Sequence, residues 1–241
     1  MIVINDIIEE IVLSLVNIND VVSFTDNLDG TYTIETTGIN DIEESFKVVL
    51  IYADTTKNRD VIVNSISGNT FTFSGTNITE PINWKLALYF EPGHRVELNK
   101  KYLNKAKSTN KRVQEYPLFW LYKDLEERPS DYDNVEFETT MQFALVDFTE
   151  KDLYEDQRIE QKFKTVLYPL LVRINNQFNK LPYKNNFVTL YRNKEIDFIK
   201  TDRPFFGSAD QSKNVMPEPT DAIECQVDLL WREERSVCSK Y

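Results

Sequence analysis

The side chains best suited to chemistry are few and scattered in this sequence. The single histidine, His94, follows a Pro-Gly turn and has no nucleophile motif near it. Nucleophilic catalysis needs a base within hydrogen-bond reach of a Ser or Cys nucleophile. Cys225 lies on the apolar side of an alternating segment and Cys238 in a polar tail, without a CxxC motif or a neighbouring histidine. We therefore expect a surface histidine, a core cysteine, no zinc site and no enzymatic activity.

Paired carboxylates offer a second possibility, because two acids at alternating strand positions lie on one face and could bind divalent metal ions. Glu136 and Glu138 have this spacing. A metal-dependent nuclease usually needs a further acid and a lysine nearby, and no such spacing occurs. The six glycines form no phosphate loop, and the aspartates between residues 26 and 60 fit no calcium loop. Alternating acids on a solvated strand face are ordinary, so we expect no metal and no other cofactor.

An aromatic segment next to a basic one could bind single-stranded nucleic acid by stacking. Segment 116–122 has four aromatic side chains and follows a lysine-rich stretch at 100–112. An acidic run at 124–133 comes directly after it, and the chain has a formal net charge of -11. Affinity for nucleic acid depends on neutralising phosphates with Lys and Arg. We interpret the aromatic segment as a core strand and the lysine stretch as a solvated loop or short helix.

The elements that position these residues begin with an amphipathic helix. Apolar residues recur at helical spacing over residues 2–17, with polar residues on the other side. This segment has no basic start, and Asp6, Glu9 and Glu10 interrupt it, so it does not fit a signal peptide. No apolar run approaches the roughly 20 residues of a membrane span, and two cysteines imply no disulfide framework. We expect synthesis in a reducing cytosol and no membrane partner.

Residues 19–91 are expected to form an inserted β-domain, a small antiparallel barrel or sandwich. The segment contains five or six short β-prone runs separated by turn residues. Asp29-Gly30 between two such runs predicts a hairpin, and Ser67-Gly68-Asn69 predicts a second turn. The last strand of the set is predicted at 84–90, and Pro92-Gly93 ends the domain.

Residues 92–241 are expected to form one α+β unit. The apolar strand at 116–122 contains Pro117, so it should lie at a sheet edge or begin at the proline. The strongest apolar–polar alternation covers 135–145, and a second alternating strand covers 223–232.

Between these two strands the sequence predicts a long helix. Thr149 and Asp152 form a possible capping box, and the helix runs to about Asn179. Pro169 falls inside its apolar stripe and should kink it. A short strand at 187–192 and a long loop at 201–220 follow. A loop of that length is usually functional or mobile.

This order of elements resembles the tail-completion, tail-terminator and neck proteins of tailed bacteriophages. The resemblance rests on four segments: YPLFWLYKD, VEFETTMQFALVDFTEKD, RIEQKFKTVLYPLLVRINNQF and DAIECQVDLLWRE. It covers residues 2–18 and about 95–235, whereas 19–91 departs from the family pattern. For residues 1–18 and 92–241 the resemblance implies one α+β core in which two helices pack on an antiparallel sheet, with 19–91 as a β-domain inserted after the first helix. The Asn-, Ile- and Lys-rich composition with few glycines suits an AT-rich genome, and within the family it suits a crAss-like phage whose neck contains stacked rings.

The resemblance implies a structural virion protein of the phage neck or tail, made in the host bacterial cytoplasm. It implies a homo-oligomeric ring of six or twelve subunits that contacts adjacent neck, portal-proximal or tail proteins, and DNA passing through the lumen without specific binding. An acidic wall repels phosphate. Our candidates for lining the lumen are the acids on the polar faces of the two long strands: Glu136, Glu138, Glu224 and Asp228.

A different class of function stays open beside the ring. The β-rich segment could be a host-surface or glycan-binding adhesion module, in which exposed aromatic side chains contact the ligand. The candidates for that role are Tyr32, Tyr52 and Trp84.

Overall fold

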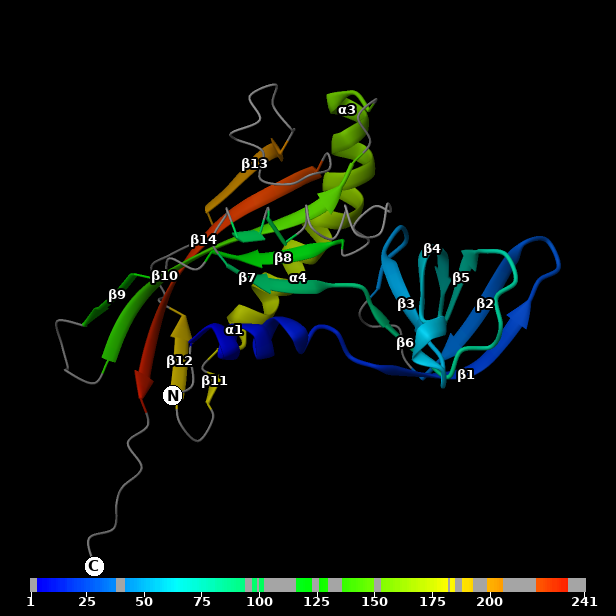
Figure 1. Cartoon of the computed structure of the whole chain (residues 1–241), viewed down its shortest axis with the longest axis horizontal. Helices are drawn as coiled ribbons and strands as arrows, with labels where there is room; N and C mark the ends of the chain where they lie inside the picture. The colour runs from blue at the N-terminus through cyan, green and yellow to red at the C-terminus, as the bar shows by residue number, and fades with distance from the viewer. Residues whose placement is uncertain are drawn as a thin grey trace, which may run out of the picture.

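A computed structural model describes residues 4–37, 42–93, 97–98, 100–101, 116–122, 126–129, 136–149, 153–181, 183–184, 188–192, 199–205 and 220–233. In these residues the chain is mixed α and β, and mostly β (Figure 1). It contains a closed barrel of six strands and an eight-stranded sheet that packs against two helices. The expected combination of an α+β core with a small β-barrel is therefore confirmed at the level of architecture.

The barrel closes in the order β1-β2-β5-β4-β3-β6, with every neighbouring pair antiparallel. Both predicted turns are confirmed, because Gly30 and Gly68 link paired strands with the positive φ that glycine adopts without strain. Buried side chains alternate with solvent-facing ones along most of these strands, whereas β3 has three consecutive buried residues and the pairing of β1 and of β4 contains a register shift. The strands are β1 (Asn19–Asp26), β2 (Thr31–Thr36), β3 (Lys47–Ile51), β4 (Arg59–Ser67), β5 (Thr70–Ser74) and β6 (Asn83–Leu86).

The predicted strand at 84–90 is wrong, because the chain leaves the barrel in the middle of it. β6 closes the barrel, whereas β7 (Tyr89–Pro92) pairs in parallel with β8 (Leu118–Leu121) in the large sheet. Three consecutive buried residues, Leu86 to Leu88, break the two-residue alternation of a strand at this point. By hydrogen bonding, the barrel therefore covers 19–86, and β7 belongs to the sheet of the α+β part.

Two long antiparallel strands form the centre of the large sheet. β10 (Glu136–Phe148) and β14 (Thr220–Glu233) pair along their whole common length, from Glu136 opposite Arg232 to Phe148 opposite Thr220. β8 and β9 (Glu126–Pro129) both pair with the other edge of β10. β12 (Val188–Arg192) and β13 (Ile199–Phe205) both pair with the other edge of β14, and β11 (Tyr183–Lys184) pairs with β12.

Two expectations about this sheet need correction. The parallel pairing of β7 with β8 makes the sheet mixed rather than wholly antiparallel. The predicted loop at 201–220 is also wrong in its first part. Residues 201–205 continue β13, which pairs with the edge of β14 that faces away from β10. Residues 206–219 of that loop lie outside the described residues. Pro117 immediately precedes β8, so the strand begins directly after the proline. Of the two predictions for this segment, an edge strand or a strand that begins at the proline, the structure supports the second.

Both helices pack on the same face of this sheet. They are α1 (Ile4–Leu13) and one continuous long helix, formed by α3 (Glu155–Arg158), η2 (Ile159–Leu167) and α4 (Tyr168–Asn179). Leu167, Leu170 and Ile174 pack in one core cluster with Phe143 of β10 and Val227 of β14. No helix in the described part of the chain is long and apolar enough to cross a membrane.

The winding of the long helix changes next to Pro169. The helix is α-helical at Glu155–Arg158, a π-helix from Ile159 to Leu167 and α-helical again from Tyr168, so the proline lies at the start of the second α-helical part. The fixed φ of proline fits a helix at this position, but Pro169 has no N–H to donate to the preceding π-helical turn of the continuous helix. The helix begins at Glu155, after the predicted capping box, and Asp152 of that box lies outside the described residues.

The barrel contacts the long helix through a loop that precedes β3. The guanidinium of Arg173 on α4 lies 5.2 Å from the ring centroid of Phe46. Its Nη2 is 3.4 Å from Glu43 Oε1. One continuous core cluster extends from the barrel interior through α1 to the sheet. The two parts therefore share an apolar boundary as well as this cation–π contact.

Deleting the barrel should leave a folded but less stable α+β part. Asn19 pairs with Trp84, so the chain enters and leaves the barrel on neighbouring strands, which lie about 4.8 Å apart. A linker of about four residues in place of 19–86 is then sufficient. We expect native-like circular dichroism with a lower melting temperature, because the deletion uncovers apolar surface beside Arg173. If the full-length protein folds and the deletion variant does not, the barrel and the α+β part are one folding unit.

Candidate functional site

A polar strip follows the two long strands on the face opposite the helices. Paired residues of antiparallel strands share a face, and the register places Glu138 opposite Leu230 and Thr140 opposite Asp228. Glu138 is exposed, whereas Asp228 and Glu224 are half-buried. We call this surface the polar strip and define it by Glu138, Thr140, Gln142, Glu224, Gln226, Asp228 and Arg232.

Hydrogen bonds from neutral donors hold two of these acids in place. The Thr140 hydroxyl donates to Asp228 Oδ1 over 2.7 Å. The Tyr122 hydroxyl donates to Glu224 Oε1 over 3.0 Å. Hydroxyl donors orient a carboxylate without neutralising its charge. The strip therefore holds the carboxylates of Glu224 and Asp228 in fixed positions.

Three of the four predicted lumen residues lie together on this strip. The backbone of Glu136 pairs with that of Arg232, while the Glu136 side chain lies outside the described part of the structure. Sequence reasoning did not include Arg232, although it alternates in step with the acids of its strand. Arg232 is exposed and pairs with Glu136 at the end of the strip. On the same face, the register places Arg128 of β9 opposite Glu138 and Arg203 of β13 opposite Ala222.

An apolar cluster covers the rest of the same sheet face. Trp120 is its largest member, and its indole Nε1 donates to the Gly93 carbonyl oxygen over 2.9 Å. The aromatic segment 116–122 is thus part of the core, which confirms the interpretation of these rings as core rather than as a stacking surface. The cluster consists of Leu98, Tyr116, Leu118, Trp120, Ala144, Val146 and Ala222.

The remaining candidates from the sequence do not form a reactive site among the described residues. Cys225 is a buried thiol in the core, as expected, whereas His94 and Cys238 lie outside the residues the structure describes. Within the described ranges, no group of three or more His, Cys, Asp or Glu side chains could hold a metal ion. The aromatic candidates for ligand binding are buried in the barrel core, which corrects the expectation that they are exposed: Tyr32, Tyr52 and Trp84.

A buried charge cluster on the helix-covered face was missed by sequence reasoning. Asp147 of β10 lies opposite Asp221 of β14, and both carboxylates are buried. The Arg158 guanidinium donates to Asp221 through Nε, 3.2 Å from Oδ2, and through Nη2. The Lys162 ammonium, one helical turn later, donates to Asp147 Oδ2 over 3.3 Å.

This cluster is suited to holding the helix on the sheet rather than to catalysis. Each buried acid has a basic partner on the long helix, and the bidentate geometry of the Arg158–Asp221 pair is the strongest form of such a contact. Two signals could have found it. Asp147 and Asp221 interrupt apolar runs at strand ends, and Arg158 and Lys162 have the spacing of one helix face.

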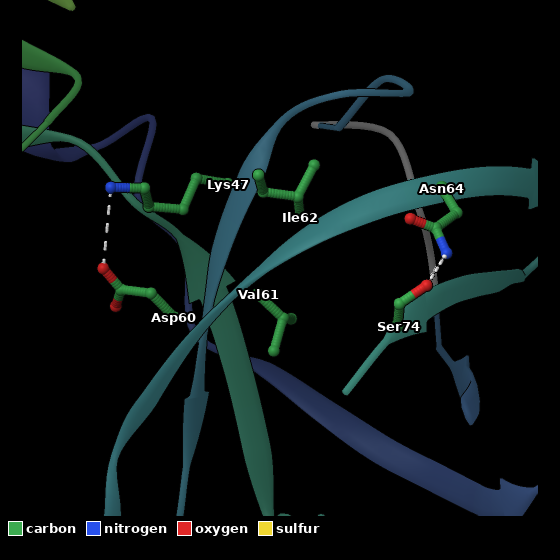
Figure 2. A pocket seen from close by; sticks show the side chains of 6 residues that line it. All are labelled: Lys47, Asp60, Val61, Ile62, Asn64 and Ser74. Atoms are coloured by element: carbon green, nitrogen blue, oxygen red, sulfur yellow. Dashed lines mark hydrogen bonds and ion pairs between the residues drawn. The ribbon is translucent and has the colours of Figure 1, made fainter. Parts of the chain in front are cut away.

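A groove of about 540 Å³ lies on the outer surface of the barrel (Figure 2). At one end the Lys47 ammonium is 3.7 Å from Asp60 Oδ2. At the other end the Asn64 side chain donates to Ser74 Oγ over 2.7 Å. Ile62 lies between these two pairs, and Val61 completes the lining. Burial raises the pKa of the Asp60 carboxyl, and the charge of Lys47 opposes this only in part.

Asp60→Asn should raise the melting temperature at pH 7. The folded protein binds the Asp60 proton more tightly than the unfolded chain does, so the charged form destabilises the fold once the pH exceeds the ordinary pKa of 3.8. The advantage of the variant should shrink as the pH falls toward about 4. Thermal unfolding between pH 4 and pH 7 measures it, with Glu80→Gln at an exposed position as the control. If Asp60→Asn is less stable than the wild type at pH 7, the ion pair of Asp60 with Lys47 stabilises the fold by more than burial of the carboxylate destabilises it.

Comparison of the chain with protein-family models, with curated proteins and with solved structures found no match. What the protein does has to be inferred from the polar strip, the buried charge cluster and the barrel groove themselves.

Proposed function

We propose that this protein is a structural virion component, which forms a ring in the neck or tail of a tailed phage and lets DNA pass through its lumen. The observation that supports the proposal best is the polar strip. Glu138, Glu224 and Asp228 lie on one face of a sheet whose opposite face carries both helices. A wall of this kind needs one fixed, acidic sheet face per subunit and no reactive group.

Electrostatics favours such a wall for passing DNA. Duplex DNA carries about one negative charge per ~1.7 Å of its axis. A basic lumen would bind the phosphates and release counterions, which would retard the genome. An acidic lumen repels the phosphates over a distance that salt limits to about 10 Å. The formal charge of -11 per subunit, repeated around a ring, strengthens this repulsion.

The proposed ring is one of the assemblies that identical subunits can form. Identical subunits that join head to tail form a closed ring when their rotation closes. The proposed ring has six or twelve subunits and stacks on adjacent neck, portal-proximal or tail proteins. The proposal assigns the protein no catalytic activity.

The adhesion alternative loses its main support. Glycan-binding sites commonly present aromatic rings on the surface, and the three rings that could have served lie in the barrel core. The groove on the barrel surface offers no aromatic ring in their place, because it is lined by Lys47, Asp60 and small polar or aliphatic side chains.

Light scattering and electron microscopy of the concentrated protein, combined with a charge reversal on the strip, test the proposal. The wild-type ring should not retain duplex DNA. Glu138→Lys should leave the ring intact and make it retain DNA in a salt-dependent way, because each subunit adds a lysine to the wall. The control, Glu80→Lys, makes the same charge change at an exposed position on the barrel.

Equal DNA retention by both variants would mean that the strip does not line the channel. A protein that forms no ring, alone or in purified virions, would contradict the proposal as a whole.

A further inference from the structure

One edge of β4 is only partly paired within the barrel. β4 runs from Arg59 to Ser67, and its pairing with β5 ends where Val63 lies opposite Phe73. On its other edge β4 pairs with β3 as far as Arg59. The first four residues of β4 therefore have a neighbouring strand on the β3 side and, in the described part of the chain, none on the β5 side.

The backbone groups of Asp60 and Ile62 face this unpaired side. In an antiparallel sheet, successive residues of a strand direct their N–H and C=O groups alternately to the two neighbouring strands. The Val63 N–H donates to the Phe46 carbonyl oxygen over 2.9 Å, on the β3 side. Val61 has the same direction as Val63, so Ile62 and Asp60 direct their groups to the β5 side.

The chain that follows β5 turns away from this edge. Ser74 is the last residue of β5, and the Gly75 N–H donates to the Gly30 carbonyl oxygen over 3.1 Å, so the chain stays beside the β1–β2 turn. The Arg59 side chain spans the gap and donates through Nη1 to the Thr76 carbonyl oxygen over 3.0 Å. A side chain, rather than a ladder of backbone hydrogen bonds, thus joins β4 to this segment.

The barrel groove lies along the same edge. Side chains from both faces of β4 line it: Val61 is buried, and Ile62 is 58% exposed. They point to opposite sides of the strand (Figure 2). A groove bounded by both faces of a strand runs along its edge, where the backbone groups lie. The volume of about 540 Å³ is in the range of ligand-binding sites.

The chemistry of the groove favours an extended polypeptide as its ligand. Unpaired N–H and C=O groups along a strand edge are a template for another extended chain. Lys47 and Asp60 form an ion pair, and the other lining side chains are neutral, so the groove has no net charge. Recognition then depends on backbone hydrogen bonds and on apolar contact with Ile62.

We propose that this edge of β4 binds an extended segment of another protein, which adds as a strand beside Asp60 and Ile62. The segment exchanges backbone hydrogen bonds with these residues and places an apolar side chain against Ile62. A single extended chain can enter the groove, whereas the β4 edge of a second copy lies in a groove of its own. The interaction goes beyond the proposed ring and does not depend on it.

Two peptides with the same side chains test the strand addition. The first is a fluorescein-labelled peptide of alternating valine and threonine with a lysine at each end. We expect saturable binding to the full-length protein with a Kd of about 1 mM or tighter. The backbone amide shifts of Asp60 and Ile62 should change most. The second peptide has methylated backbone nitrogens and cannot donate, so it should bind about tenfold more weakly or worse.

A matched pair of variants tests the position of the site. Ile62→Lys adds the kind of charge that protects natural strand edges, and it should abolish peptide binding. The control, Ile82→Lys, has a similar exposure of 55% but lies outside the groove, and it should bind as the wild type does. Both positions are exposed, so both variants should melt near the wild-type temperature.

Several outcomes would overturn the proposal. Absence of binding at about 1 mM peptide would do so, and so would equal binding of the two peptides by the wild-type protein. Shift changes confined to residues away from Asp60 and Ile62 would place the peptide at a different edge. Shifts of these two amides that depend on protein concentration alone would assign the edge to a second copy instead.

Discussion

Arg158→Met should lower the free energy of unfolding by about 3–5 kcal/mol, the cost typical of breaking a buried ion pair from one side. The Asp221 side chain has a relative exposure of 0%, and Arg158 supplies its bidentate partner from the long helix. Removing the guanidinium leaves a carboxylate in the core without a counter-charge, close to Asp147 on the neighbouring strand. Urea unfolding followed by circular dichroism measures the loss.

A double variant shows whether the charge or the packing is responsible. Arg158→Met with Asp221→Leu removes both charges and keeps similar volumes, so most of the lost stability should return. If the double variant is as unstable as the single one, the side chains act through shape and other contacts. If Arg158→Met alone is as stable as the wild type, the ion pair does not hold the helix on the sheet.

Leu167→Asp should prevent the α+β part from folding, with a loss of about 4 kcal/mol or more. Leu167 is fully buried between the long helix and the sheet, and Phe163→Asp on the same stripe should act in the same direction. The control on the same helix is Val172→Asp, because Val172 is 57% exposed and should tolerate the charge. Thermal unfolding compares the three variants. A Leu167→Asp protein that melts at the wild-type temperature would show that this stripe is not core.

Local patterns were sufficient to predict most strands and turns. Asp29-Gly30 and Gly68 lie in tight turns because glycine takes positive φ, and this preference is visible in a single sequence. The alternation around Met141 predicted β10 because one face is buried and the other is solvated. These signals depend only on neighbours along the chain.

What could not be predicted depends on contacts between distant segments. The end of the barrel at Leu86 and the parallel pairing of β7 depend on which sheet accepts the next strand. Closure of the barrel buries Tyr32 and Trp84, which a single strand pattern allows on either face. The pairing of Asp147 with Asp221 exists only because β10 and β14 align over their full length.

The candidate site was predicted in part for the same reason. Each strand pattern placed its acids on a polar face, but only the register of β10 with β14 brings Glu138, Glu224 and Asp228 onto one surface. The groove combines Lys47 of β3, Asp60 of β4 and Ser74 of β5, so barrel closure creates it. No spacing within one strand predicts it.

A map of the assembled particle, at a resolution that shows side chains, tests the central claim most directly. We predict a closed ring of this chain in the neck or tail, with the polar strip facing the channel: Glu138, Glu224 and Asp228, together with Glu136 of the same strand. The lysine-rich stretch 100–112 should then point away from the lumen, toward acidic neighbours. The account is contradicted if these acids lie on the outer wall or in subunit contacts while Lys or Arg side chains line the channel.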